Sequence, residues 1–291
     1  MRERARLVIL LGVAGVSLSA VFTRWSTAPA MVLALYRMAL SAALMAVPAL
    51  ARRRELASLS RQDAALCLIS GCFLGLHFTA YFAALERTSI AAAVVLVDTE
   101  VLFVALASAA VLGQHLSGRA WGAAVLAFGG AAAVAVSSRG DGIALSGNLI
   151  ALSGTAAMAV YTMIGAVCRR KLSTEVYTFL VYLAASAFLL AASLLGGMPL
   201  TGHGGVNLLT ALGMAVCCTL LGHNVFSWGL KYLPAAFIAT AKLLEPVLAS
   251  VWGLLLFGER PGVLTLMGGG AVLGGIALYT CASAEAERKT I

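Results

Sequence analysis

Few ionisable side chains lie inside the long apolar stretches of this sequence, and those few could do chemistry. Glu100 and Glu245 each lie near the middle of such a stretch, and Asp98 precedes Glu100 by two residues. Arg37 and Lys242 are the basic residues in comparable positions. A charged group in hydrocarbon costs at least ~2.5 kcal/mol, so it usually faces a cavity, a partner or a pathway. The pattern predicts a polar site for a solute or a proton.

Each of these residues also has a structural interpretation. Lys242 and Glu245 are three residues apart and share one helix face, so they could form an internal ion pair or contact the solute. Arg37 could bind a carboxylate or neutralise Asp98 or Glu100, and we favour the neutralising role. Asp98 and Glu100 point about 200° apart around a helix. We therefore expect one of them to line the site and the other to brace a neighbouring helix.

Uncharged polar and aromatic side chains complete the candidate site. His77 and His223 suit proton coupling because the ordinary pKa of histidine is about 6.5. For His223, which precedes Asn224, we favour a buried, hydrogen-bonded role. Tyr81 and Tyr161 are candidates to line a cavity, since aromatic walls with a few charges suit an amphipathic solute or an organic cation. No metal-ligand spacing occurs, so we expect neither a metal nor a cofactor.

Membrane-spanning helices must position these residues. Of the 291 residues, 61% are hydrophobic and 11% are charged, whereas soluble domains carry about 25% charged residues. The apolar stretches therefore predict an all-α integral membrane protein with a lipid bilayer as its surroundings. The ten predicted transmembrane helices cover residues 7–24, 29–50, 63–85, 89–112, 119–137, 146–167, 174–196, 207–230, 234–257 and 261–282.

The distribution of Lys and Arg predicts the orientation. With the N-terminus inside, fourteen of the twenty basic residues fall in cytoplasmic segments, four in external segments and two within helices. This positive-inside bias predicts a multi-pass protein of the cell inner membrane with cytoplasmic N- and C-termini. It also accounts for the net charge of +8 without nucleic acid, which we do not expect as a partner.

The two halves of the sequence repeat one another. At a constant offset of 145 residues, the matched pairs are 84–89 with 229–234, Glu100 with Glu245, 112–115 with 257–260, and Gly129–Gly130 with Gly274–Gly275. In the first helix of each half, 21–23 matches 160–162. A unit of five helices is odd-numbered, so its second copy enters the membrane in the opposite orientation. We predict two inverted five-helix repeats, residues 1–138 and 139–291.

Small residues predict close helix packing. Gly118-x-x-x-Gly122 and Gly270-x-x-x-Gly274 lie in the fifth and tenth predicted helices. Such spacings let helix backbones approach closely, either inside the monomer or across a homodimer contact. The sequence leaves both arrangements open.

Several stretches carry a family resemblance. They are 37–44, 84–93 (ALERTSIAAA), 112–117 (LGQHLS), 222–236 (GHNVFSWGLKYLPAA) and 243–260 (LLEPVLASVWGLLLFGER). With them, almost the whole chain resembles the drug/metabolite transporter superfamily in its ten-helix EamA-type branch. The resemblance implies paired five-helix repeats around a central cavity. One departure is Asp98–Thr99–Glu100, where the family often has a proline after a threonine; the added carboxylates favour a cationic or zwitterionic solute.

We therefore expect a secondary transporter that moves a small amphipathic metabolite, an amino acid or a derivative, by alternating access. We favour export, with proton coupling as an option. One alternative is proton-coupled uptake of an organic cation such as a quaternary amine. An alternative of another class is a non-transporting membrane scaffold or sensor, which would not need charges at matched depths. We do not expect an enzyme, because no nucleophile or metal constellation is present.

Overall fold

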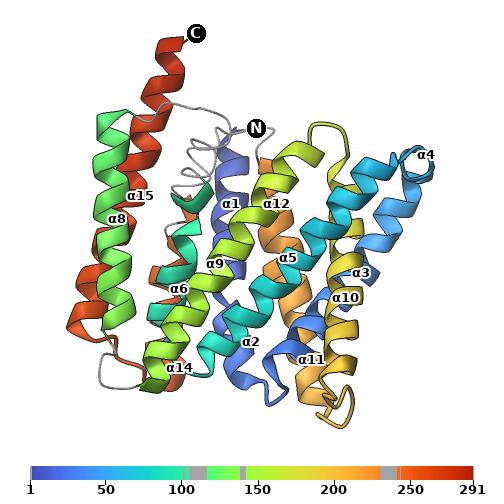
Figure 1. Ribbon diagram of the computed structural model, residues 1–291, viewed down its shortest axis with the longest axis horizontal. Coiled ribbons are helices and arrows are strands. Elements are labelled where there is room, and N and C mark those ends of the chain that lie inside the picture. The colour runs from blue at the N-terminus through green and yellow to red at the C-terminus, as the bar shows by residue number, and fades with distance from the viewer. Residues whose placement is uncertain are drawn as a thin grey trace.

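The chain forms a bundle of transmembrane helices (Figure 1). The computed structural model describes residues 2–100, 102–104, 117–137, 142–229, 241–242 and 244–290, and no strand occurs among them. Seven helices of these residues are long and apolar enough to cross a membrane, and Leu244–Phe257 and Val263–Tyr279 are shorter apolar helices. Both termini lie at the same end of the bundle, here called the terminal end, as ten crossings require (Figure 1).

The helices follow the predicted order. In the first half they are α1 (Arg2–Ser17), α2 (Ser19–Trp25), α3 (Ala30–Ala51), the short α4 (Arg53–Ala57), α5 (Arg61–Leu85), α6 (Ile90–Asp98) and α8 (Gly118–Val136). In the second half they are α9 (Gly142–Cys168), α10 (Thr174–Leu195), α11 (Gly205–Gly213), the π-helix η1 (Met214–His223), α12 (Asn224–Gly229), α14 (Leu244–Phe257) and α15 (Val263–Thr290). Parts of the predicted helices 89–112, 207–230 and 234–257 lie outside the described residues.

Some elements differ from the uniform helices that the apolar stretches predict. The first crossing divides at Leu18 into α1 and α2, and α4 forms in a segment expected to be a loop. α15 continues to Thr290, beyond the predicted end at 282. The eighth crossing contains ten residues of π-helix, a form often found at functional sites.

The fourth crossing is interrupted beside its acidic residues. In a continuous α-helix, the Leu96 carbonyl would accept the N–H of Glu100. Here it accepts the backbone N–H of Thr99 at 3.3 Å and two hydroxyl groups, from Thr99 at 2.6 Å and from Thr155 of α9 at 3.1 Å. Side-chain hydroxyls that compete for a backbone carbonyl weaken a helix, so α6 ends at Asp98.

The packing of the helices relates the two halves. α3 packs on α10, α6 on α14 and α8 on α15, so equivalent helices of the two halves pair with each other. α5 packs on α9, and the equivalent pair, η1 and α1, also packs together. α9 enters from the end opposite to the N-terminus (Figure 1). These pairings are those of two inverted five-helix repeats.

Glycines bring α8 and α15 together, but they are not those of the two Gly-x-x-x-Gly spacings. A Cβ added to Gly130 would lie 2.5 Å from the Gly268 carbonyl oxygen, and one added to Gly275 would lie 2.6 Å from the Ala127 Cβ. Gly118, Gly122, Gly270 and Gly274 would have nothing within 4 Å of an added Cβ. Of the two arrangements that the sequence leaves open, close packing of those four glycines inside the monomer does not occur among the described residues, because they lie on other faces of the two helices.

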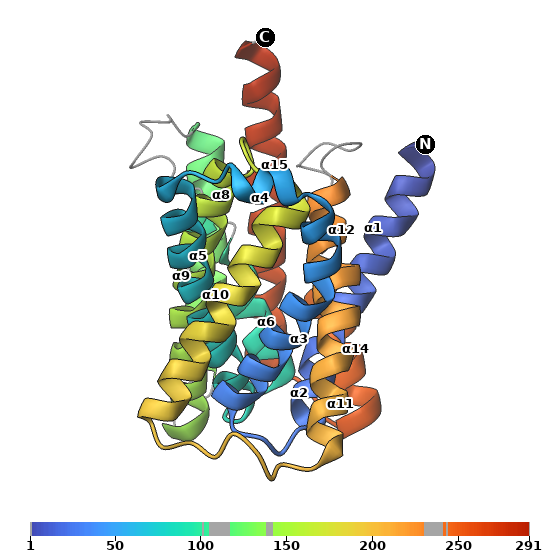
Figure 2. The same ribbon diagram turned by 90° about the vertical axis from the view of Figure 1, so that its right-hand side faces the viewer.

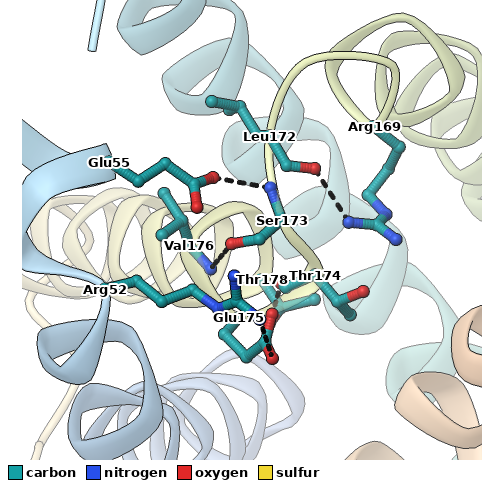
Figure 3. A network of polar contacts seen from close by, with 9 residues as sticks. All are labelled: Arg52, Glu55, Arg169, Leu172, Ser173, Thr174, Glu175, Val176 and Thr178. Carbon is teal, nitrogen blue, oxygen red and sulfur yellow. Dashed lines mark hydrogen bonds and ion pairs between the residues drawn. The ribbon is translucent and has the colours of Figure 1, made fainter. Parts of the chain in front are cut away.

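Polar contacts tie the halves together at the terminal end. Figure 3 shows α3 and α4 meeting the loop between α9 and α10. The Glu55 carboxylate accepts the backbone N–H of Ser173 at 2.6 Å, and Arg52 pairs with Glu175 at 3.1 Å. Beside them, Lys171 pairs with Asp63 at the start of α5 at 3.3 Å. The view in Figure 2 shows α4 lying across this end of the bundle.

Equivalent contacts tie the halves at the opposite end. Asn207, near the start of α11, accepts the backbone N–H groups of Thr27 at 2.7 Å and Ala28 at 3.1 Å. Arg24, at the end of α2, pairs with Glu259 at 2.8 Å, in the loop that follows α14. The second carboxylate oxygen of Glu259 accepts the N–H of Ile90 at 2.9 Å. Both ends of the bundle are therefore bridged in this structure.

Candidate functional site

Glu100 joins the two halves at the centre of the bundle. One of its carboxylate oxygens lies 3.8 Å from Lys242 Nζ. The other accepts a 2.5 Å hydrogen bond from the hydroxyl group of Thr162 in α9. The interrupted backbone at Thr99 precedes Glu100 directly, and Glu100 is buried. Both contacts reach from the first half of the chain to the second.

Two further carboxylates lie near this pair. Asp98 interacts electrostatically with Glu245, Lys242 and Glu100. Its Oδ2 is buried and has no hydrogen-bond partner in the described part of the chain. Glu245, in the first turn of α14, interacts with Lys242, Arg37 and Glu100. The structure thus gathers all five predicted ionisable groups into one charged centre, with three acids and two bases.

Arg37 is held on the far side of this centre by uncharged groups. Its Nε donates to the Thr219 hydroxyl and its Nη1 to the Ser19 hydroxyl, each at 3.1 Å. Its guanidinium carbon lies 4.0 Å from the centroid of the Phe78 ring, which favours a cation. The side chain is 1% exposed, and its Nη2 is buried without a partner among the described residues.

Aromatic rings fill the space between the two bases. His223 meets Phe78 and Phe226 edge-on, with ring centroids 6.4 Å apart in both cases. Lys242 Nζ lies 6.0 Å from the centroid of Phe226. The row of rings therefore runs from Arg37 to Lys242 and contributes attraction to both cations.

The other predicted polar residues lie around this centre. The His77 Nδ1 is 3.0 Å from the Gly154 carbonyl oxygen, and its ring stacks on that of Tyr81 at 6.2 Å. Tyr161 interacts electrostatically with Glu100. Asn224 accepts a 3.1 Å hydrogen bond from the Tyr182 hydroxyl. His77 thus makes the kind of backbone contact that a structural role predicts.

Two of the predicted pairings differ from the observed ones. Lys242 pairs with Glu100 rather than with Glu245 on its own helix face. Among the described residues, Arg37 contacts Thr219, Ser19 and Phe78 rather than forming an ion pair with Asp98 or Glu100. Its role as a neutraliser of these acids stays a prediction. Both differences arise because the relative rotation and depth of packed helices determine which side chains come into contact. Glu100 does brace a neighbouring helix, through Thr162, as we expected of one of the two acids.

Sequence reasoning missed the uncharged members of the site. Ser19, Thr219 and Thr162 hold the charged groups, and Phe78 and Phe226 contact the bases. A hydroxyl in an apolar stretch is common, so residue type alone does not single these residues out. For two of them, the sequence offered one signal, which is adjacency to a predicted site residue. Phe78 follows His77, and Thr162 follows Tyr161.

Known proteins resemble this chain along most of its length. The sequence model of the EamA-like transporter family matches the chain twice, at residues 4–136 and at residues 145–281. The chain is 27% identical over 253 residues to the pseudopaline exporter CntI of Pseudomonas aeruginosa, covering 84% of each chain. It is 27% identical over 230 residues to the uncharacterized transporter YwfM of Bacillus subtilis, covering 78% of this chain and 74% of YwfM.

A solved structure shares the fold. It is a crystal structure with 19% sequence identity and a TM-score of 0.65, and the match covers 97% of this chain and 98% of the other.

Proposed function

Because this chain belongs to the EamA-like transporter family, we propose that it is a secondary transporter of a small amphipathic metabolite, an amino acid or a derivative. Its transport would proceed by alternating access, in which the two inverted repeats, residues 1–138 and 139–291, exchange conformations. The proposed binding site is the charged centre around Glu100, Glu245 and Asp98.

The ion pair between Glu100 and Lys242 carries the proposal. It lies in the interior of the bundle and connects the first half to the second, through two helices that are equivalent in the repeat. A group that must hold a solute between two moving halves needs this placement. Buried charges are costly, and their accumulation in one centre supports a binding role over a purely structural one.

Direction and location are part of the proposal. We assign export because CntI, a relative that covers most of the chain, is named as an exporter. The fourteen-to-four bias of basic residues supports a cell inner membrane location with both termini in the cytoplasm. His77 and His223, beside the charged centre, are the proposed proton carriers if transport is proton-coupled.

Transport by the purified protein in liposomes tests this function. We expect counterflow of a labelled amino acid or amine, and at least a tenfold loss of rate in Glu100→Gln and in Glu245→Gln. The matched control is Glu86→Gln, which removes an exposed carboxylate away from the centre. Wild-type rates in both glutamine variants at every pH would show that the site is placed wrongly.

A second candidate function is proton-coupled uptake of an organic cation such as a quaternary amine. The three acids and two bases of the centre favour it, because one negative charge is left for a cationic solute. An imposed pH gradient separates the two candidates: it would drive an organic cation inward, whereas export of a metabolite would show the opposite net flux.

A non-transporting scaffold or sensor is the alternative of another class. The same liposomes address it, because a scaffold would show no flux of any solute. It would also show no thermal stabilisation across a panel of amino acids, amines and nucleosides.

A further inference from the structure

A hollow of about 430 Å³ lies at the end of the bundle opposite to the termini, which is the lower end in Figure 1. Its walls are the end of α5, the loop before α6, the end of α8 and the starts of α9 and α15. Both halves of the chain therefore contribute to it. Because transmembrane helices begin and end near the lipid headgroups, we expect the hollow to lie at headgroup depth.

Three arginines line this hollow, namely Arg24, Arg87 and Arg260. The orientation derived from the sequence places only four basic residues in segments at this end, and the fourth, Arg139, lies outside the described residues. Basic residues are disfavoured in external segments. Their convergence on one hollow, out of a chain that otherwise excludes them from this end, indicates that an anionic partner binds there.

The positive charge of the hollow exceeds the negative charge of its carboxylates. Among the described residues, Glu259 pairs with Arg24 at 2.8 Å and Glu86 with Arg87 at 3.7 Å, whereas Arg260 adds a third positive charge on an exposed side chain. The Glu86–Arg87 pair is long and more than a third exposed on both sides, so it is weak. Arg87 can therefore exchange this partner for a stronger acceptor.

Apolar side chains are exposed beside the hollow. Val136 ends α8, Ile143 lies near the start of α9 and Val263 begins α15, and each is adjacent in sequence to a residue that lines the hollow. These three side chains are between 45% and 74% exposed. A small soluble anion gains nothing from such a rim, whereas the acyl chains of a lipid can cover it. The partner that fits both features is an anion with an apolar tail.

We propose that the hollow binds the phosphate group of an anionic phospholipid. Arg87 and Arg260 donate to the phosphate, with the forked geometry that arginine offers to phosphate oxygens, and Arg24 adds its charge. The acyl chains lie along the exposed apolar ends of α8 and α15. Because Arg87 belongs to the first half and Arg260 to the second, one headgroup bridges the halves beside the Arg24–Glu259 contact. The inference goes beyond the proposed function, since lipid binding requires no transported solute.

Lipid titration of the purified protein tests the headgroup requirement. Dioleoyl phosphatidylglycerol and dioleoyl phosphatidylcholine, which share their acyl chains, are added to the protein in a neutral detergent. Native mass spectrometry measures the affinity, and thermal unfolding measures the stabilisation. We expect tighter binding and a higher melting temperature with phosphatidylglycerol. Equal affinity for the two lipids would overturn the inference.

Arginine variants with a matched control locate the site. Arg87→Gln and Arg260→Gln should each weaken phosphatidylglycerol binding roughly fivefold, with little change for phosphatidylcholine. Arg53→Gln is the control, because it removes the same charge from an exposed position on α4 at the terminal end. Equal weakening in Arg53→Gln and Arg260→Gln would mean general attraction to the charge of the protein and would contradict this site. Affinity is measured for each variant separately, so altered stability of the lipid-free protein does not hide the result.

Two further measurements separate a lipid from a free anion. Inorganic phosphate and glycerol 1-phosphate are tested at the concentrations used for the lipid, and stabilisation equal to that by phosphatidylglycerol would overturn the assignment to a lipid. Hydrogen–deuterium exchange should slow with phosphatidylglycerol in segments 86–92 and 258–266, on the two sides of the hollow, but not in segment 169–174 at the terminal end. Slowing at the terminal end alone would contradict the proposed location. Since none of these readouts is transport, absence of flux in liposomes counts only against the proposed function.

Discussion

At the scale of single residues, the charged centre shows how a membrane protein distributes its buried charges. Lys242 pairs with one acid and interacts with two others, so one cation stabilises several carboxylates. Arg37 depends on hydroxyl groups and an aromatic ring instead. Because the Nη2 of Arg37 has no hydrogen-bond partner in the described part of the chain, this side chain keeps donor capacity for a ligand.

The Glu100–Lys242 pair should show thermodynamic coupling. Lys242→Gln leaves Glu100 without its cation, and we expect a loss of about 1–3 kcal/mol. This is less than the ~3–5 kcal/mol for a fully buried pair, because the Lys242 side chain is 26% exposed. SDS-induced unfolding followed by circular dichroism measures it. The double variant with Glu100→Gln should lose less than the two single losses combined; strict additivity would contradict the pairing.

At the scale of helices, irregular segments coincide with the polar site. The α1/α2 break supplies Ser19, the π-helix supplies Thr219, and the end of α6 lies beside Glu100. In a bilayer, freed backbone groups must find partners inside the protein. Thr99 and Thr155 provide such partners at the Leu96 carbonyl. Regular helices such as α8 and α15 pack through glycine and alanine instead.

Adjacent glycines on α8 should respond differently to the same substitution. Gly130→Ala places a Cβ 2.5 Å from the Gly268 carbonyl oxygen, whereas Gly129→Ala meets nothing within 4 Å. Overpacking typically costs about 1–3 kcal/mol, so Gly130→Ala should lower the melting temperature in detergent and Gly129→Ala should not. Equal effects of the two variants would be inconsistent with the α8–α15 contact described above.

At the scale of the whole molecule, contacts at both ends hold the halves together. Asp63 lies in the first turn of α5 and contacts Lys171, and Asn207 lies near the start of α11 and contacts the loop before α3. α5 and the α11–η1 crossing are equivalent in the repeat, so these contacts are related and lie at opposite ends. The Arg24–Glu259 pair additionally links α2 to the loop after α14.

Locking the Arg24–Glu259 contact should stop alternating access. In the double variant Arg24→Cys/Glu259→Cys, a short reducible methanethiosulfonate cross-linker should lower the rate of transport in liposomes at least tenfold. Reduction of the cross-link should restore the rate. The wild-type chain, which retains its six native cysteines, controls for labelling elsewhere. Full transport by the cross-linked variant would show that this end of the bundle does not need to open.

Much of this architecture follows from the linear order of residues. Apolar length predicts the ten crossings because each helix must span the hydrocarbon independently, and the cost of burying a charge singles out Asp98, Glu100 and Glu245. Partner choice depends instead on the rotation and depth of packed helices, which residue spacing within one helix does not specify. For that reason, the Lys242–Glu100 pair and the hydroxyl anchors of Arg37 emerge only when helices far apart in the chain are brought together.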